Sequence, residues 1–275
     1  MLKKRLIPVV LLRNGVVVQS KGFQRYQRLG NPVTVVQRLT DWAADELIYL
    51  DISRDNNYDL GRDDLNTQNR KNLLEILRDV AQRCYMPLTF GGGIRSVYDA
   101  ACRITAGADK ISINSRPLEA PNFITECAKE FGSQCVVVSI DAIQQSNEIY
   151  EVVGQGGKLR TGRLPTDWAR EAEARGAGEI LINSVDRDGK GTGFDLKLIQ
   201  SVANAVRIPV IALGGAGKWE DFNICLNSTN VSAVAAANIF HYTENSVFKA
   251  KEYLIKEKAN VRAPSLGVIT SEGLI

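Results

Sequence analysis

Pro87-Leu88-Thr89-Phe90-Gly91-Gly92-Gly93-Ile94-Arg95 is an apolar run that ends in three consecutive glycines. The helix-type pattern Ser96-Val97-Tyr98-Asp99-Ala100-Ala101 follows it. This order predicts a buried strand, a turn without side chains and a helix, and the backbone N–H groups of such a turn suit a phosphate. The same order returns in Ile208-Pro209-Val210-Ile211-Ala212-Leu213-Gly214-Gly215-Ala216-Gly217. One such turn is weak evidence because glycines also serve tight packing, but two at equivalent places indicate a repeated chain.

Length and composition describe an ordinary globular protein. The chain has 275 residues, of which 44% are hydrophobic and 24% charged, so it can build a large core. A net charge of +3 is too small to indicate a nucleic-acid or membrane partner. The five cysteines are scattered without a C-x-x-C pair, which predicts a reducing, cytoplasmic setting with neither disulfides nor a metal site. No apolar run approaches a membrane span, and nothing implies a cofactor.

Apolar runs rich in β-branched residues alternate with helical patterns along the whole chain. We expect strands near 5–11, 46–52, 86–90, 109–114, 135–141, 179–184, 208–213 and 231–237. We expect helices from Asn31-Pro32 and near 67–84, 96–106, 120–131, 166–175, 195–206, 218–227 and 244–258. Strict alternation of eight strands and eight helices predicts a (β/α)8 TIM barrel, with a doubly wound open sheet as the alternative.

The two halves of the chain resemble each other. Residues 44–55 align with 177–188 at an offset of 133, whereas the glycine turns at 91 and 214 align at an offset of 123. Ten residues are therefore extra in the first half, and the polar segment 56–66 is the obvious insertion. A barrel made of two half-barrels places its two phosphate turns on opposite sides of one mouth. That geometry fits a phosphorylated small molecule, with a phosphate at each end.

Several motifs in this order are similar to one enzyme family. They are Asp45-Glu46-Leu47, Gly91-Gly92-Gly93-Ile94-Arg95-Ser96, residues 107–115 (GADKISINS), residues 132–138 (GSQCVVV), Asp186-Arg187-Asp188-Gly189 and Gly214-Gly215-Ala216-Gly217. This set resembles the cyclase subunit of imidazole glycerol phosphate synthase, HisF, over residues 1–262, and leaves 263–275 as an extension of unknown role. The resemblance implies a glutaminase (HisH-like) partner on the N-terminal face of the barrel. It also implies that ammonia passes through the barrel to a bisphosphorylated ribonucleotide, which two aspartates help to cyclise.

Only one of the two catalytic aspartates that the resemblance implies is present. Asp141 matches the second, at the end of Val136-Val137-Val138-Ser139-Ile140. The first should end the first strand, where this chain has Leu11, and the internal repeat points to the same position. Gln19 likewise replaces a phosphate-contacting lysine of the family. A leucine carries no proton, so normal cyclase activity is doubtful unless another group, such as Asp51, substitutes.

The N-terminal face keeps the family pattern. The resemblance assigns an ammonia gate to four charged residues that open strands, namely Arg5, Glu46, Lys110 and Glu179. Charged residues at these places need partners inside a barrel, so a ring of alternating sign is expected, and for a generic barrel such a ring would only plug the interior. Asp109 and Gln134 match positions that contact the glutaminase.

The resemblance also assigns phosphate contacts at the mouth. One site takes Gly91, Gly92, Gly93, Asn114 and Ser115, and the other takes Gly189, Gly214, Gly215 and Asn238. Polar groups at the C-terminal ends of barrel strands belong to binding sites more often than to packing.

Three classes of function are compatible with these observations. The first is the histidine-pathway cyclase itself, against which Leu11 and Gln19 argue. The second is a barrel without ammonia traffic, against which the retained charged residues argue. The third, which we favour from the sequence, is a paralogue of the surface-polysaccharide type. By resemblance, it would pass ammonia from a glutaminase to a sugar amidotransferase that forms an acetamidino group on a nucleotide-linked sugar.

Overall fold

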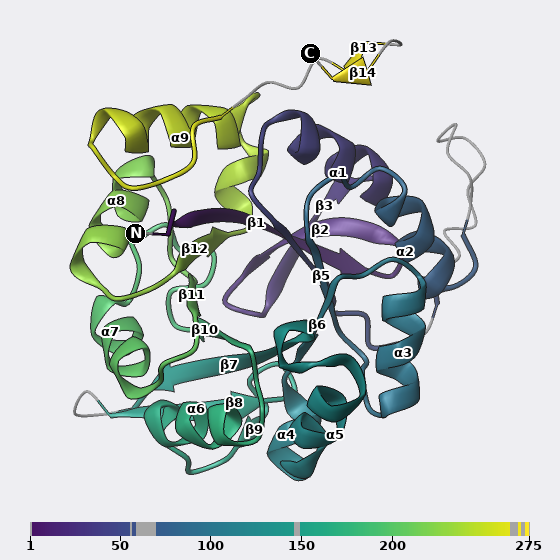
Figure 1. Cartoon of the computed structure of the whole chain (residues 1–275), viewed down its shortest axis with the longest axis vertical. Coiled ribbons are helices and arrows are strands. Elements are labelled where there is room, and N and C mark those ends of the chain that lie inside the picture. The colour runs from purple at the N-terminus through teal and green to yellow at the C-terminus, as the bar shows by residue number, and fades with distance from the viewer. Residues whose placement is uncertain are drawn as a thin grey trace.

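Eight parallel strands close into a barrel at the centre of the molecule (Figure 1). The computed structural model describes residues 2–55, 57–58, 70–145 and 149–264, and the backbone of 269–270 and 273–274. The barrel strands are β1 (Arg5–Arg13), β4 (Leu47–Asp51), β5 (Leu88–Gly91), β6 (Lys110–Ile113), β7 (Val136–Gln144), β10 (Glu179–Ser184), β11 (Val210–Leu213) and β12 (Ala233–Ala236). Each pairs with its neighbours in this order, and β1 closes the barrel against β12. The predicted (β/α)8 barrel is confirmed, and the open-sheet alternative is wrong.

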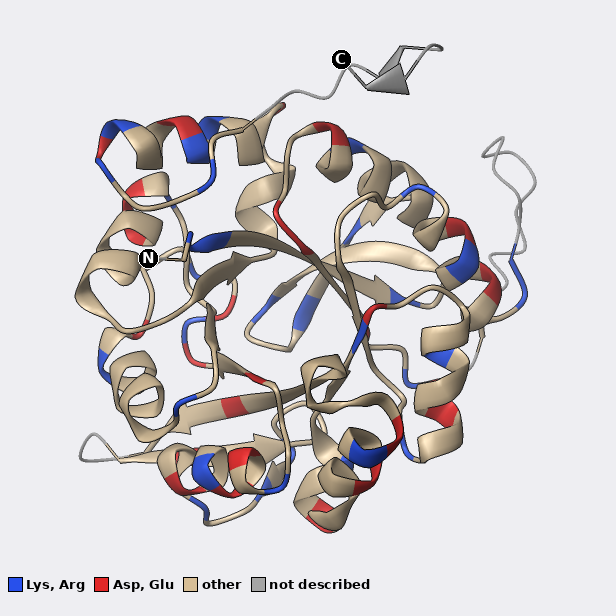
Figure 2. Cartoon of the chain, in the orientation of Figure 1, with Lys and Arg blue, Asp and Glu red and all other residues tan. Residues whose placement is uncertain are grey.

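Helices surround the barrel and follow its strands (Figure 1). They are α1 (Pro32–Asp41), α2 (Leu73–Ala81), α3 (Val97–Thr105), α4 (Ser115–Glu119), α5 (Asn122–Phe131), α6 (Pro165–Ala174), α7 (Leu196–Ala205), α8 (Trp219–Ser228) and α9 (Ser246–Lys256), with the 3-10 turns η1 (Ser133–Cys135) and η3 (Asn238–His241). The predicted start of α1 is confirmed, because Asn31 accepts a hydrogen bond from Val33 N ahead of the proline. Figure 2 shows both charge signs interleaved on the outer helices, which is typical of solvent-facing surfaces.

Side chains of the barrel strands alternate between two separate apolar cores. Leu6, Val10 and Tyr49 belong to the large core between the strands and the helices. Ile7, Val9 and their counterparts from the other strands form a smaller core inside the barrel, which comprises Ile7, Val9, Ile48, Val137, Leu181, Ile211, Leu213, Ala233 and Ala235. This alternation decides which residues at the strand ends face the mouth.

Two antiparallel hairpins extend the barrel at its C-terminal end, and the sequence analysis did not predict them. β2 (Val16–Lys21) and β3 (Arg25–Gly30) continue from β1, while β8 (Tyr150–Gly154) and β9 (Leu159–Arg160) continue from β7. They occupy equivalent places in the two halves, after the first and the fifth barrel strands. The Asn14-Gly15 turn, with positive φ at both residues, joins β1 to β2 and was a readable signal that the chain reverses there.

The remaining predictions concern the insertion and the tail. Of the segment 56–66, only 57 and 58 lie within the described residues, so its identity as the insertion stays a prediction. In the tail, β13 (Ile269–Thr270) pairs with β14 (Gly273–Leu274), and the boundary between a 1–262 barrel and an extension remains an expectation. In the part of the chain that the structure describes, no helix combines the length and apolar character needed to cross a membrane.

Candidate functional site

Two glycine turns face each other across the C-terminal mouth of the barrel. Gly91 ends β5 and is followed by Gly92 and Gly93, whereas Gly214 and Gly215 follow β11, four strands away in a ring of eight. Gly92 has a φ of +103°, and a Cβ there would lie 2.0 Å from the carbonyl oxygen of Asp51. A side chain at Gly92 would collide with the end of β4, so the backbone is left bare there.

The other predicted phosphate-contacting residues lie at the same mouth. Asn114 follows β6 and Ser115 opens α4, and the Ser115 hydroxyl donates a hydrogen bond to Asn114 Oδ1. On the opposite side, Gly189 lies in the loop after β10, and Asn238 opens η3 after β12. The structure therefore brings both predicted sets together at the mouth, one set on each side. Their binding of phosphate remains a prediction.

Asp141 lies near the end of β7, and two amides donate to its carboxylate. Asn183 Nδ2 is 2.9 Å from Oδ1, and Asn114 Nδ2 is 3.0 Å from Oδ2. Burial raises the pKa of Asp141 to about 6, with a further rise from Asp188, while the hydrogen bonds from the two asparagines oppose this rise. A carboxyl group that titrates near neutrality can both accept and donate a proton at cellular pH.

Leu11 faces the barrel interior at the position where the sequence analysis expected an aspartate and found a leucine. It packs against the core inside the barrel and pairs in register with Leu50 of β4, which packs against the same core. One side of the mouth is thus apolar, and the other side holds Asp141 with its two amides. Leu11 therefore gives Asp141 no partner carboxylate from β1.

Asp51 does not replace the missing aspartate. It alternates with Leu50 and lies on the Tyr49 side of β4, toward the helices, so its side chain does not face the mouth. Its carboxylate already accepts hydrogen bonds from the Ser53 hydroxyl and the Tyr58 hydroxyl, each at 2.6 Å. The suggestion that Asp51 takes the role of the missing aspartate is therefore corrected, because successive side chains of a strand point to opposite faces.

The β2–β3 hairpin reaches over the mouth to the second half of the barrel. The Ser20 hydroxyl donates to Asp188 Oδ2 at 3.0 Å, and Gly22 N donates to the Asp188 carbonyl at 3.1 Å. Asn238 Nδ2 donates to the Ser20 carbonyl at 2.7 Å. Burial raises the pKa of Asp188, although hydrogen bonds from this hairpin favour its charged form. Gln19 is bonded to Gln27 of the neighbouring strand and carries no charge to the mouth.

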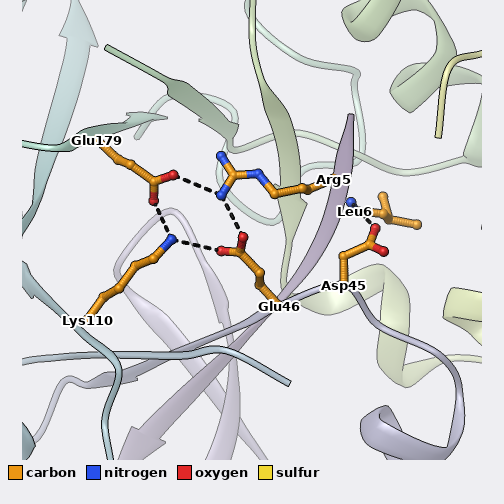
Figure 3. Close-up of polar contacts among 6 residues, drawn as sticks. All are labelled: Arg5, Leu6, Asp45, Glu46, Lys110 and Glu179. Carbon is orange, nitrogen blue, oxygen red and sulfur yellow. Dashed lines mark hydrogen bonds and ion pairs between the residues drawn. The ribbon is translucent and has the colours of Figure 1, made fainter. Parts of the chain in front are cut away.

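Four charged side chains form a closed ring at the opposite, N-terminal end of the barrel (Figure 3). Arg5 Nη1 lies 2.6 Å from Glu46 and 2.8 Å from Glu179, while Lys110 Nζ lies 3.3 Å and 3.0 Å from the same two carboxylates. Each cation thus contacts both anions. Burial disfavours the charged form of Arg5, yet the attraction of Glu179 and Glu46 outweighs it and raises the pKa of Arg5.

The two predicted partner-contacting residues are exposed on the same N-terminal face. Asp109 immediately precedes β6, and Gln134 lies in η1, just before β7. Asp109 also has a structural role, because its Oδ2 accepts a hydrogen bond of 2.8 Å from Leu88 N. Gln134 Nε2 makes only a 3.3 Å bond to the Phe131 carbonyl and a 3.8 Å contact with Cys135.

Small polar side chains line one wall of the barrel between the ring and the mouth. Thr89 and Ser112 are 2% and 5% exposed, and they alternate with outward-facing neighbours on β5 and β6. Ser139 continues this wall on β7, between the inward-facing Val137 and Asp141. Across from them, the barrel interior is aliphatic. The described residues contain no group of three or more His, Cys, Asp or Glu side chains placed to hold a metal ion.

Two site residues were missed from the sequence. Asn183 was absent from the predicted set, although Glu179, Leu181 and Asn183 alternate along β10 and must face the same way. Ser20 was missed because the β2–β3 hairpin was not predicted. Its partner Asp188 is 168 positions away in the chain, so no local sequence pattern could predict the contact.

Comparison with known proteins agrees with this geometry. The family model described as "Histidine biosynthesis protein" matches residues 5–246. The chain is 42% identical over 262 residues to the imidazole glycerol phosphate synthase subunit HisF of Hyphomonas neptunium, covering 95% of this chain and 99% of that protein. It is 41% identical to the HisF subunit of Dehalococcoides mccartyi and 39% identical to that of Alkaliphilus metalliredigens, with matching coverage of 95% of this chain. Identity of this extent shows that the chain belongs to the HisF family of imidazole glycerol phosphate synthase subunits.

Proposed function

We propose that this chain is the synthase subunit of a glutamine-dependent amidotransferase. A separate glutaminase binds its N-terminal face and releases ammonia there, and the barrel conducts the ammonia to a phosphorylated acceptor at the mouth. The observation that carries the proposal is the ring of Arg5, Glu46, Lys110 and Glu179, which closes the barrel at the end opposite the acceptor site.

The composition of the barrel interior supports this route. A structural plug would need only well-packed aliphatic side chains, which avoid the desolvation of four charged groups. The hydroxyls of Thr89, Ser112 and Ser139 instead offer hydrogen-bonding groups along one wall, and a small polar molecule needs such groups in an otherwise apolar passage. The ring and the polar wall lead to Asp141, near the end of β7.

The relatives favour the acceptor of histidine biosynthesis. Their names refer to imidazole glycerol phosphate, and they match this chain over nearly its whole length. The first candidate acceptor is therefore the bisphosphorylated ribonucleotide that the family cyclises, with its two phosphates at the two glycine turns. Asp141 would provide the proton transfer at the mouth.

A second candidate rests on one departure from the family pattern. Leu11 leaves the mouth with a single carboxylate, and Gln19 removes a positive charge from the hairpin. Both changes leave the ring untouched, so delivery of ammonia could persist while cyclisation declines. In this candidate, a sugar amidotransferase takes up the ammonia for acetamidino-sugar formation in surface-polysaccharide (O-antigen, lipopolysaccharide) biosynthesis.

Complementation separates the two acceptors. The chain and its glutaminase partner are expressed together in a strain that lacks the histidine cyclase subunit. Growth without histidine supports the first candidate and removes the second. Absence of growth, combined with glutamine-dependent amidination of a nucleotide-linked sugar in the presence of the sugar enzyme, supports the second. Release of ammonia without transfer to either acceptor would contradict the proposal as a whole.

The partner surface has its own test. Gln134→Arg changes the exposed N-terminal face without removing a strand contact, whereas Asp109→Lys would also break the bond to Leu88 N. We expect Gln134→Arg to weaken glutaminase binding at least tenfold in calorimetry. Arg25→Glu, on the exposed edge strand at the opposite end, is the matched control and should leave the affinity unchanged. No complex at micromolar concentration with the unmodified chain would remove this part of the proposal.

The role of the insertion is testable by deletion. Tyr58 marks its described beginning and is held to the end of β4 through Asp51. A deletion of 60–66 keeps that anchor. If the segment docks the sugar enzyme, the deletion should abolish transfer to the sugar while glutaminase binding persists.

A further inference from the structure

Asn183 is a buried amide with a single hydrogen-bond partner. Its side chain is 4% exposed, and its Nδ2 donates to Asp141 Oδ1 at 2.9 Å. Its own Oδ1 is buried and has no hydrogen-bond partner among the described residues. An unsatisfied buried acceptor costs stability, and each such group in a native structure calls for an explanation.

Asn114 differs from Asn183 in this respect. Its Nδ2 donates both to Asp141 Oδ2 and to the Ser139 carbonyl, and its Oδ1 accepts from the Ser115 hydroxyl. Asn114 thus ties the end of β6 to β7 and to the start of α4, which is reason enough for an amide there. No such structural reason applies to Asn183, whose one bond goes to Asp141.

We propose that Asn183 is a positioning residue whose amide fixes the Asp141 carboxylate in the orientation needed for proton transfer at the mouth. The proposal deepens the proposed function, on which it rests, because it concerns the carboxylate to which that function assigns the proton transfer. The amide holds Oδ1 from the β10 side while Asn114 holds Oδ2 from the β6 side, so rotation of the carboxylate is prevented. The proton that Asp141 takes from the bound molecule is afterwards released to water.

The surroundings make this role necessary. Across the mouth, Leu11 and Leu50 offer no hydrogen bond to the carboxylate. The charged group that acts on Asp141 from a neighbouring element is Asp188, in the loop after β10, and its repulsion favours protonation. Without the amide donors, burial would shift Asp141 further toward its neutral form, in which it is no base. Asn183 therefore keeps the carboxylate available as well as oriented.

The proposal is tested without substrate, so its failure is distinct from a failure of the proposed function. The protein is labelled with 13C at aspartate carboxyl groups, the Asp141 signal is assigned by its loss in Asp141→Asn, and its titration is followed by NMR. In Asn183→Leu, which keeps the number and branching of the side-chain heavy atoms, we expect the pKa of Asp141 to rise by about one pH unit, the shift typical of losing a hydrogen bond to a charged group. Ser184→Ala, at the next and outward-facing buried position, is the control and should leave the titration unchanged.

A second variant keeps the test decisive if the leucine variant does not fold. Asn183→Asp places a carboxylate within hydrogen-bonding distance of Asp141 Oδ1, so the two groups should share a proton and titrate in two separated steps. An unshifted Asp141 titration in a folded Asn183→Leu protein, or two independent normal titrations in Asn183→Asp, would overturn the proposal. With an active assembly, Asn183→Leu should also lower kcat at pH 7 far more than it changes KM, because the group acts on proton transfer.

Discussion

Lys251 Nζ lies 2.7 Å from Asp45 Oδ1, and both side chains are almost entirely buried. The same ammonium group donates to the Ala43 carbonyl. The other oxygen of Asp45 accepts from Leu6 N, as Figure 3 shows. Through these bonds, the last helix α9 is joined to the first strand and to the segment before β4. Both ends of the barrel sequence thus meet in one hydrogen-bonded unit.

Removing the lysine should therefore destabilise the barrel strongly. In Lys251→Met the Asp45 carboxylate stays buried without its counter-charge, for which we expect a loss of about 3–5 kcal/mol in the free energy of unfolding. Urea denaturation measures it. Lys256→Met, an exposed lysine on the same helix, is the control and should change stability by less than about 0.5 kcal/mol. Equal effects of the two substitutions would show that the buried pair contributes little.

The ring at the N-terminal end leads to a prediction about coupled charges. Arg5→Met leaves Glu46 and Glu179 with only Lys110 between them, so we expect a loss of about 3 kcal/mol at pH 7. The double variant Arg5→Met/Glu179→Gln should recover most of the loss, and additive losses would contradict a coupled ring.

Much of this fold was predictable because the strand signal is local. Each barrel strand is a short apolar run between turn residues, and the run length of four to nine residues suffices to recognise it. The β2–β3 hairpin was overlooked, although the Asn14-Gly15 turn that joins β1 to β2 was readable, because polar residues such as Gln19 and Lys21 interrupt the apolar pattern. An edge hairpin with one solvent-facing side does not need a continuous apolar run.

The candidate site likewise contains residues that the sequence pattern predicts and contacts that it does not predict. Strand-end residues such as Asp141 and the glycine turns follow from the repeat and the strand pattern. The orientation of Asp51 was also accessible, since a period of two starting from Ile48 turns Leu50 inward and Asp51 outward. Contacts between distant loops, such as Ser20 with Asp188, depend on tertiary packing and leave no local pattern.

Asp141 should lower the stability of the protein at neutral pH. Its pKa of about 6 lies above the value near 3.8 of an ordinary aspartate, so in acid the folded state binds the extra proton. The stability linked to this proton is present below about pH 4 and is lost as the pH rises through about 6. Asp141→Asn resembles the protonated form at every pH, and we expect it to be about 1–3 kcal/mol more stable than the parent at pH 7.5.

The pH dependence of that difference is the sharper observation. The gain from Asp141→Asn should vanish near pH 4, where the parent is protonated as well. His241, whose pKa is lowered to about 4 by burial with a contribution from Arg38, titrates in the same window but is present in both proteins. Its contribution cancels in the comparison. A constant difference between pH 4 and pH 7.5 would mean that Asp141 titrates normally.

Leu11 supplies the last prediction. If its position is where the reaction needs a second proton-transferring group, the unmodified chain should convert the bisphosphorylated ribonucleotide with ammonium salts only slowly. Leu11→Asp, combined with Gln19→Lys, should then raise that rate by about 10²–10⁴-fold, the usual contribution of one positioned acid or base. The restored pair would have two carboxylates in one layer of the mouth, and their pKa values would separate by mutual repulsion, which suits one acid and one base.

Leu50→Asp is the matched control for Leu11→Asp. Leu50 pairs in register with Leu11 on the neighbouring strand and packs against the same core, so a carboxylate there carries a similar burial penalty. Both substitutions should lower the stability by comparable amounts, and only the one at position 11 should restore turnover. Restoration by both would show that a negative charge anywhere in the mouth suffices. Rapid conversion by the unmodified chain would mean that Asp141, held by its two amides, performs both proton transfers, and the argument from Leu11 would then be wrong.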